Sequence, residues 1–482
     1  MADDLAAFVD SHDTTAVAEA VRRGDIDPGE LLELTFERID ERDPALHAMV
    51  TLRKQRARAE IAALDRDAPF VGVPFVVKDL GAEVAGMPAT RGSRLFADDV
   101  AEHDSELVAR YRRAGFVIVG TTNTPELGKN ASTEPLLHGP TRNPHRLTHS
   151  PGGSSGGTAA AVAAGIVGIG HGNDGGGSLR IPASACGLVG LKPSRGRVTA
   201  APELSLLAYP LGVNHVLSRS VRDSARALDA TGGPFPGDPY VIDQPTRSWL
   251  SHCHDPWPRL RIGVATHDRT GDPIHADAVA AVRSSADLLS DLGHEVIDAA
   301  PNYPNDAFAF VMRIVAGVAT KVTVDDRLAQ LGRELRDDDL EPFTRLLYDR
   351  AGSETGEDVL RAMREIERAA RGVGCFFVDH DLLLTATLAQ PTPELGHLDT
   401  TDPMAMVQRA GAYSILTSPF NVTGQPAISL PLGTDATGLP LGSQLVAGFG
   451  REDLLLAVGA QLEQARPWDI NPVWPPRREA ED

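Results

Sequence analysis

The chain has 482 residues, of which 42% are hydrophobic and 23% charged, ordinary proportions for a globular protein of one to three domains. Its formal net charge of -20 argues against a nucleic-acid binder, which needs a basic surface, and disfavours contact with an anionic membrane. The acidic N-terminus has no basic or apolar signal region, and no run reaches the roughly 18 apolar residues of a membrane-spanning helix. We therefore expect a cytoplasmic protein.

The first part of the chain predicts helices followed by buried strands. "TTAVAEAVRRGD" has a threonine cap and a glycine stop, and "DPGELLELTFERIDERD" has Asp27 as N-cap and Pro28 at the first helical position. The pattern of hydrophobic residues then changes: "PFVGVPFVVKDL" (69–80) is typical of a strand buried on both faces. A helix ending at Gly115 and a short buried strand at 116–120 follow.

Glycine-rich loops dominate the next part of the chain. Residues 123–157 form a loop rich in Asn, Pro, Thr and Gly, which is too long for an ordinary connection and therefore of functional interest. "TAAAVAAGIVGIG" predicts a helix running into a strand, and "DGGGSLRIPASACGLVGLKPSRGR" predicts a glycine loop, a short helix and a strand. This alternation predicts an α/β layered sheet.

The remaining chain continues the alternation. Residues 218–300 hold the strands "RIGVA" and "HEVIDAA" around a helix at 274–292, residues 301–375 are helical and charged, and two buried strands precede a helix at 452–465. We predict a single domain over residues 1–482. Its predicted parts are an N-terminal helical section (1–65), a core that carries the functional loops (66–230) and a peripheral helical section that covers the substrate (301–410).

Three cysteines, Cys186, Cys253 and Cys375, are odd in number and widely scattered, so we expect all three to be reduced. Cys186, inside "ASACGLVG", is typical of a buried small hydrophobic residue. "HCHD" (252–255) has H-x-H spacing, but the chain offers no second cluster of ligands, so we expect no metal site there.

A nucleotide site is one hypothesis for the glycine loops. "GHGNDG" (170–175) matches G-x-G-x-x-G, but a single match is a weak signal. A dinucleotide site also needs an acidic residue about 20 positions later, and the chain has none between Asp174 and Glu203. Because G-x-x-x-x-G-K-[ST] is absent as well, nucleotide binding is disfavoured.

A serine esterase of the α/β-hydrolase type is a second hypothesis, since "GGSSG" (152–156) matches G-x-S-x-G. The nucleophile of that class directly follows a buried strand. Here Pro140, Pro144 and Pro151 precede the match and exclude a central strand. The residues that precede the motif therefore argue against the esterase hypothesis.

Two serines and a lysine support a third hypothesis. A serine hydroxyl is a poor nucleophile unless a base contacts it, and a lysine becomes such a base when burial lowers its pKa. Lys78, one of only five lysines in the chain, ends the apolar run at 69–80, where burial is expected. Ser154 and Ser178 lie 24 residues apart and could supply a nucleophile and a proton shuttle, while the N–H groups of "DGGGS" suit a developing oxyanion.

The chain resembles the amidase signature hydrolases. The motifs that carry the resemblance, between residues 10 and 470, are "VGVPFVVKDL", "TTNTPELG", "GPTRNP", "SPGGSSGG", "GNDGGGSLRIPAS", "GLKPSRGR", "PFNVTGQPAISLPL" and "ARPW". The resemblance implies the amidase signature fold, an α/β architecture with a large mixed twisted β-sheet covered by helices on both faces. It also implies an amidase that works through an acyl-enzyme with no metal or organic cofactor.

Matched to the family residue by residue, Ser178 is the acylated nucleophile, Ser154, in a cis peptide, is the bridging serine, and Lys78 is the base. Taken singly, each serine would more often be a helix N-cap and Lys78 a strand-end residue, so the assignment depends on their joint spacing. The supporting residues that the resemblance implies are an oxyanion hole at the backbone of Gly175, Gly176 and Gly177 with Ser178, an Asp174–Arg180 ion pair, and the hydroxyl of Ser155.

Within the family, the main alternative is the glutamine-hydrolysing A subunit of a tRNA-dependent amidotransferase. That subgroup typically reads D-T-G-G-S-I-R-Q-P, whereas this chain has "DGGGSLRIP", with Gly175 for Thr and Ile181 for Gln. The segment looks more like stand-alone bacterial amidases, including those that resemble 6-aminohexanoate cyclic-dimer hydrolases. We expect an amidohydrolase (EC 3.5.1, with amidase 3.5.1.4 favoured) that acts on a small-molecule amide without nucleic-acid or membrane partners. A homodimer is one of the oligomeric states compatible with the sequence. The sequence does not specify the acyl group of the substrate.

Overall fold

The computed structural model describes residues 2–208, 210–256 and 259–476. Within these residues, eleven strands form one sheet in the order β1-β3-β2-β4-β6-β5-β10-β11-β9-β7-β8. In chain order the strands are β1 (Met49–Leu52), β2 (Pro74–Lys78), β3 (Val117–Thr122), β4 (Ile169–Asp174), β5 (Val189–Lys192), β6 (Val213–Ser218), β7 (Arg261–Val264), β8 (Glu295–Asp298), β9 (Leu382–Ala386), β10 (Ala427–Thr434) and β11 (Pro440–Ala447).

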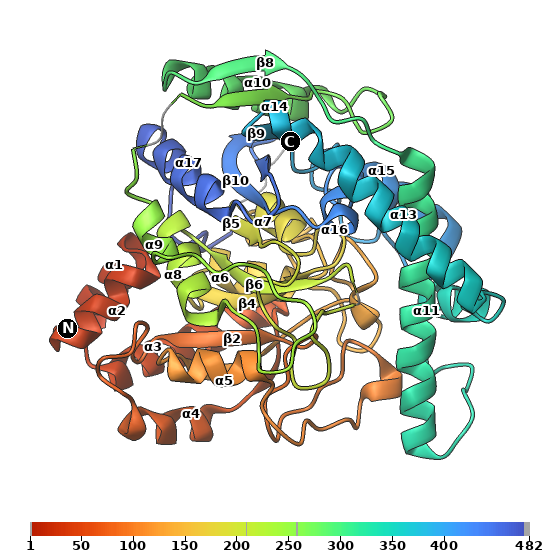
Figure 1. Ribbon diagram of the computed structural model, residues 1–482. Helices are drawn as coiled ribbons and strands as arrows, with labels where there is room; N and C mark the ends of the chain where they lie inside the picture. The colour runs from red at the N-terminus through yellow and green to blue at the C-terminus, as the bar shows by residue number, and fades with distance from the viewer. Residues whose placement is uncertain (1, 209, 257–258, 477–482) are drawn as a thin grey trace, which may run out of the picture.

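Helices surround this sheet (Figure 1). In chain order they are α1 (Ala2–Ser11), α2 (Thr14–Arg23), α3 (Pro28–Leu46), α4 (Lys54–Glu60), α5 (Glu106–Arg113), α6 (Gly156–Ala163), α7 (Arg180–Cys186), α8 (Val221–Thr231), α9 (Trp249–His252), α10 (Ala276–Asp291), α11 (Asn305–Leu331), α12 (Pro342–Ala351), α13 (Gly356–Gly374), α14 (Phe376–Asp379), α15 (Pro403–Ser414), α16 (Pro419–Thr423) and α17 (Glu452–Ala465). Three short 3-10 helices are η1 (Ile61–Ala63), η2 (Arg94–Phe96) and η3 (Glu126–Gly128).

Strand direction divides the sheet into three parts. β2 is parallel to β3 and β4, and β1 closes this side antiparallel to β3. From β4 through β6, β5, β10 and β11 to β9, every neighbouring pair is antiparallel. β7 is parallel to both β8 and β9. The carboxyl ends of β2 and β4 therefore lie at one end of the strands, called here the β4 end, and those of β7 and β9 lie at the opposite β9 end.

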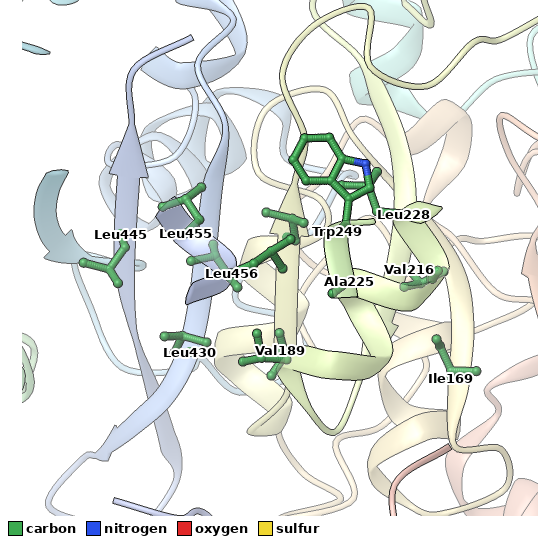
Figure 2. Close-up of a cluster of buried hydrophobic side chains, with 14 of the residues drawn as sticks. Ile169, Val189, Val216, Ala225, Leu228, Trp249, Leu430, Leu445, Leu455 and Leu456 are labelled. Carbon is green, nitrogen blue, oxygen red and sulfur yellow. The ribbon is translucent and has the colours of Figure 1, made fainter. Parts of the chain in front are cut away.

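Both faces of the sheet are buried. On β9, Leu382 and Leu384 belong to one core cluster and Leu383, between them, to another on the opposite face, as the alternation of side chains along a strand requires. Helices α8, α10 and α17 cover the first face, and Figure 2 shows Leu228 of α8 and Leu455 of α17 in that core. Helices α3 and α6 cover one half of the other face, and α11, α13 and α16 the other half. The predicted fold class, a mixed sheet with helices on both faces, is confirmed.

Most of the predicted elements are present, with differences near the N-terminus. α3 begins as expected, because the Asp27 carboxylate accepts hydrogen bonds from the backbone of Gly29 and Glu30. The threonine cap predicted for α2 is wrong, since Asp13 caps that helix by accepting from the Ala16 amide. The section 1–65 is also not helical throughout, because β1 pairs with β3 inside the sheet.

Two further predictions need correction. The strand predicted over 69–80 is confined to β2, because residues 69–73 form turns in which Gly72 has a φ of 73°. The section 301–410 is not wholly peripheral, because β9 lies within the sheet between β11 and β7. β9 is a short apolar run, and such a run cannot be told from a buried helix segment by its pattern alone. The division of the single domain into sections otherwise stays a prediction.

The cysteines and one long helix bear on the predicted environment. Cys186, Cys253 and Cys375 are all free thiols, as predicted, and Cys186 is buried. One described helix, spanning Asp306–Leu331 of α11, is long and apolar enough by length and composition to cross a membrane. However, 44% of its most apolar window is buried inside the protein, and this side packs against α13.

Candidate active site

Lys78, the last residue of β2, is fully buried at the β4 end of the sheet. Its Nζ lies 2.7 Å from Ser154 Oγ and donates a hydrogen bond of 2.7 Å to Asn173 Oδ1. Asn173 belongs to the neighbouring strand β4, and its Nδ2 donates to the carbonyl oxygen of Leu80 at 2.7 Å. The side-chain amide of Asn173 is thus held from both ends, and it sets the position of the lysine amine.

The electrostatic surroundings of Lys78 favour its neutral form. Burial lowers the pKa of Lys78 well below its ordinary value, and the charge of Asp174 opposes this shift only in part. Behind the strand, His171 Nδ1 accepts a hydrogen bond of 3.3 Å from the Lys78 backbone, and burial lowers the pKa of this histidine to about 3. Burial therefore favours the form of the amine that offers a lone pair to the Ser154 hydroxyl.

Ser154 lies in a loop wedged between residues 130–132 and α7. The peptide bond between Gly153 and Ser154 is cis, in agreement with the resemblance. A Cβ atom at Gly153 would lie 2.7 Å from the carbonyl oxygen of Ser132, and one at Gly152 would lie 2.8 Å from Pro182 Cα. These close approaches require glycine at both positions. They also leave Ser154 only 1% exposed, so its hydroxyl meets Lys78 away from water.

Ser155, the second serine of the pair, does not cap helix α6. It occupies the N-cap position without a side-chain capping bond, and the Gly156 amide donates instead to Thr133 Oγ1 at 3.1 Å. Ser155 Oγ donates to the Asn173 carbonyl oxygen at 3.3 Å and accepts from the Asn173 amide at 3.4 Å. This serine therefore has no helix-capping role. Ser155 supports β4 at the residue that holds Lys78.

Ser178 follows β4 across the glycine loop 175–177. Gly177 has a φ of 139°, and a Cβ atom there would lie 2.3 Å from Thr417 Oγ1, so only glycine fits. Thr417 Oγ1 also donates to the Gly176 carbonyl oxygen at 2.6 Å. Ser178 is 9% exposed, more than Ser154, and its hydroxyl makes no hydrogen bond with any described residue. It is the serine that a bound molecule can reach.

The front of the glycine loop is open. A Cβ atom at Gly175 would meet nothing within 4 Å, and the nearest neighbour of one at Gly176 would be Met312 Cε at 3.8 Å. In the part of the chain that the structure describes, no group accepts a hydrogen bond from the backbone N–H groups of residues 175–178. Consecutive free N–H groups of this kind form a cradle for negative charge.

A buried ion pair anchors this loop. Arg180 Nε and Nη2 each donate to the Asp174 carboxylate at 2.9 Å, and both side chains are 0% exposed. The same carboxylate accepts from the Leu179 amide at 3.2 Å and from Asn421 Nδ2 at 2.9 Å. Burial alone would raise the pKa of Asp174, but the Arg180 charge and these hydrogen bonds hold it at about 2. Asp174 is therefore a permanent anion between β4 and the loop.

Three residues that the sequence analysis did not single out complete the network. Arg180 Nη1 donates to Gln444 Oε1 at 2.7 Å and to the Thr417 carbonyl oxygen at 2.8 Å, and Nη2 donates to Asn421 Oδ1 at 2.7 Å. Asn421 falls within the quoted motif "PFNVTGQPAISLPL", which could have identified it. Thr417 and Gln444 carry no such signal, because only the fold brings them to the loop.

The alternatives from the sequence find no matching geometry. Neither Ser154 nor Ser178 bonds a histidine among the described residues, so no Ser–His pair of the esterase type forms. Gly170 and Gly172 of "GHGNDG" lie inside strand β4 rather than in a loop that could hold phosphates. Lys78 and Ser154 are brought into direct contact, whereas Ser178 hydrogen-bonds to neither.

Two groups of residues in the described part of the chain have the side-chain types of metal ligands. His252 of "HCHD" pairs with Asp255, its Nδ1 lying 2.9 Å from a carboxylate oxygen. Within the described ranges, one group has ligand atoms close enough to share an ion, namely Glu83, His103 and Glu203, with two of the three residues exposed. His103 and Glu203 already form a pair at 2.6 Å, and none of the three belongs to a motif above. The absence of a cofactor stays a prediction.

Comparisons with known proteins extend over nearly the whole chain. A protein-family model described as Amidase matches residues 30–456. The 6-aminohexanoate-cyclic-dimer hydrolase of Paenarthrobacter ureafaciens is 40% identical over 472 residues, which cover 95% of each chain. A solved structure of 6-aminohexanoate cyclic dimer hydrolase has a TM-score of 0.90 at 38% identity, covering 96% of this chain and 98% of that one. A bacterial aryl acylamidase of the amidase signature family has a TM-score of 0.87 at 27% identity, covering 97% and 100%.

Proposed function

The chain belongs to the amidase signature family and is an amide-hydrolysing enzyme of class EC 3.5.1, and on this premise we propose that it acts through Ser178, Ser154 and Lys78. The observation that carries the proposal is the 2.7 Å contact between Lys78 Nζ and Ser154 Oγ in a fully buried setting. Burying an amine is costly unless it is neutral, and a neutral amine against a hydroxyl is a base. The overall reaction converts a carboxylic amide and water into a carboxylate and an amine.

Acylation begins with a proton relay. Ser154 gives its proton to the lone pair of Lys78 Nζ and takes the proton of the Ser178 hydroxyl, whose oxygen attacks the amide carbonyl carbon. The carbonyl π electrons move to oxygen, and the free N–H groups of residues 175–178 receive this negative charge. Because these donors are already in place before the reaction, they need no reorganisation when the charge develops.

Release of the amine reverses the relay. Ser154 donates its proton to the amide nitrogen, Lys78 returns a proton to Ser154, and the C–N bond breaks to leave an ester on Ser178. Water then attacks the ester carbonyl while Ser154 takes a proton from it and passes its own proton to Lys78. The relay returns one proton to the leaving Ser178 oxygen, and the carboxylic acid product departs and loses its remaining proton to solvent.

Two sets of side chains position these groups without entering the chemistry. Asn173 fixes the Lys78 amine by accepting one N–H, which leaves the lone pair for Ser154. Asp174 and Arg180 hold the loop that carries Ser178. Gly153, beside Ser154, lets this loop pack closely against the backbone of Ser132.

The substrate that we propose is a small uncharged amide, and the first candidate is the cyclic dimer of 6-aminohexanoate. The identity of 40% over 95% of the chain to a hydrolase of that name supports this choice. The open front of the glycine loop also faces an apolar residue, Met312 of α11. This contact supports the further proposal that the section 301–410 covers the substrate.

The experiment incubates the purified chain with 6-aminohexanoate cyclic dimer and measures the new primary amino groups that ring opening releases. The wild type and the exposed-residue control Asp338→Asn should open the ring, and Ser178→Ala should not. Ring opening by Ser178→Ala would overturn the triad. A wild type that hydrolyses other amides but leaves this dimer intact would overturn the substrate alone.

The glutamine-hydrolysing A subunit is the less supported alternative. Ile181, where that subgroup has glutamine, lies 3% exposed in a cluster of mainly apolar residues that includes Leu388 and Met406. The alternative predicts glutaminase activity that rises when amidotransferase partner subunits are added. Free glutamine should therefore be a poorer substrate than simple aliphatic amides.

A further inference from the structure

A second cavity lies at the β9 end of the sheet, away from the proposed catalytic groups. Its volume is about 770 Å³, and it is bounded by the loop after β7 (residues 265–275), the loop after β9 (387–398) and Ala412 of α15. No member of the triad and no residue of the glycine loop borders it. Its volume falls in the range of roughly 300 to 1,000 Å³ that is usual for small-molecule sites.

The topology of the sheet explains why a cavity forms there. β7 lies between β8 and β9 and is parallel to both. The connection from β7 to β8 runs through α10, whose Val282 packs with Leu384 on one face. The chain that follows β9 runs through α15 to α16, whose Phe420 packs with Leu383 on the other face. The loops after β7 and β9 therefore leave in opposite directions, and ligands of open α/β sheets bind in the crevice at such a switch point.

The walls of the cavity are held in place by backbone hydrogen bonds. The His275 amide donates to the Ala389 carbonyl oxygen at 2.9 Å, which joins the two loops. Within the first loop, Asp268 Oδ1 accepts from the amides of Thr270 and Asp272 at 2.8 and 3.0 Å. In the second loop, the carbonyl oxygen of Pro393 accepts from the Ser150 amide at 2.9 Å. The cavity is therefore preformed.

Two carboxylates and two histidines border the cavity. Asp268 and Glu394 border it from the two loops, together with His275 and His397, and no lysine or arginine borders it. Among the described residues, Asp268 Oδ2 and the whole Glu394 carboxylate make no hydrogen bond or salt bridge, although the Arg269 guanidinium interacts electrostatically with Asp268. The remaining wall is largely apolar, with Ile274, Leu395 and three prolines. Two carboxylates above an apolar wall suit a molecule with a cationic head and an apolar body.

We propose that this cavity is a second small-molecule site that binds an organic ammonium ion. The ammonium group lies near the carboxylates of Asp268 and Glu394, and the apolar body lies against the proline-rich wall. The two carboxylates favour such a cation over an anionic ligand. The proposal does not depend on the proposed triad or on the identity of the amide substrate.

The location is tested by soaking crystals with 4-bromobenzylammonium and mapping the bromine by anomalous diffraction. The bromine should lie between the loops that follow β7 and β9. Bromine found only beside Ser178, or at neither site, would overturn the proposal. This amine contains no amide bond, so the result is the same whether or not the proposed catalytic mechanism is correct.

The charge requirement is tested in solution by titration calorimetry with 4-bromobenzylammonium and with 4-bromobenzoate, an anion of similar shape. The ammonium ion should bind and the benzoate should not. Asp268→Asn keeps the Oδ1 acceptor of its turn, and Glu394→Gln keeps the side-chain length. Each should weaken ammonium binding about two- to fivefold, the scale of one exposed charge pair. The control Asp338→Asn removes a remote exposed charge, and an equal loss in that variant, or equal binding of benzoate, would overturn the proposal.

Discussion

The two ends of the sheet hold their charges in different ways. At the β4 end, Lys78, Asp174 and Arg180 are 0% exposed, and each meets partners supplied by the chain. At the β9 end, Asp268 and Glu394 border an open cavity. The comparison teaches that burial favours the neutral form of an amine, because removal of water disfavours the ammonium form. Charges that keep their water can attract a ligand but are poorly suited to this chemistry.

Among the variants at the β4 end, Ser178→Ala should cause the largest loss of catalytic activity. Removal of a nucleophile that acts as part of a unit costs about four to six powers of ten in kcat. The fold should stay intact, with an unfolding free energy within about 0.5 kcal/mol of wild type, because the hydroxyl bonds no described residue. Steady-state kinetics and urea unfolding measure the two quantities. Mass spectrometry of a fluorophosphonate adduct gives an independent check, and labelling of Ser154 instead would reverse the assignment.

Lys78→Met should have the next largest effect on rate. It keeps the length of the side chain but removes the base, and a general base contributes about two to four powers of ten. The rate of amide hydrolysis measures the loss, with Lys54→Met, at a partly exposed lysine, as the matched control. Full activity of Lys78→Met would show that the contact with Ser154 has no role in catalysis.

Lys78→Met should also change how the folding stability depends on pH. Unfolded Lys78 binds a proton up to about pH 10.4, whereas the folded amine is deprotonated well below that pH. The unfolded state therefore binds more protons, and the contribution of Lys78 to folding stability is lost as the pH falls through this window. Urea unfolding from pH 7 to 9.5 should show wild type gaining stability relative to Lys78→Met as the pH rises. A difference that is constant with pH contradicts a neutral buried amine.

Arg180→Met tests whether the buried ion pair at the β4 end serves stability alone. It leaves Asp174 buried without its cation, which should cost about 3–5 kcal/mol of unfolding free energy. Arg197→Met is the matched control, because Arg197 makes two 3.0 Å hydrogen bonds to buried Glu452 away from the glycine loop. Both variants should unfold at lower urea concentration, but only Arg180→Met should also slow turnover per folded molecule. Arg180→Lys provides a milder change if the first variant does not fold.

Variants of Asn173 should give the smallest change in hydrolysis rate at pH 7. They should also give a shift of the pH–rate profile that is specific to the contact with Lys78. Asn173→Ala removes one hydrogen bond to Lys78 and should slow hydrolysis by about tenfold or less. Asn173→Asp places a carboxylate against the amine, which favours the ammonium form and raises the pKa of Lys78. The acidic limb of its pH–rate profile should therefore move to higher pH. A purely structural role for Asn173 would lower the rate without moving that limb.

The sequence predicted the fold class and most helices because their local signals are strong. Asp27 and Pro28 mark the start of α3, and glycine stops mark the ends of others. The sequence did not predict β1, β6 or β9, because these strands are short and their assignment depends on the strands they pair with. It also did not predict that Thr133, from the preceding loop, accepts a hydrogen bond from the Gly156 amide at the start of α6.

For the site, the sequence by itself determined the inventory: a lysine after an apolar run, two serines at a specific spacing and a glycine loop, which together indicated the family. Only the tertiary structure decided the surroundings of the Lys78 amine, since these depend on burial from every side and on Asn173 from a neighbouring strand. Only the tertiary structure also decided that Thr417 and Gln444 support the loop, through contacts with Arg180 across 237 and 264 residues. The physical reason is that burial and hydrogen-bond partners are properties of packed neighbours, which sequence order does not specify.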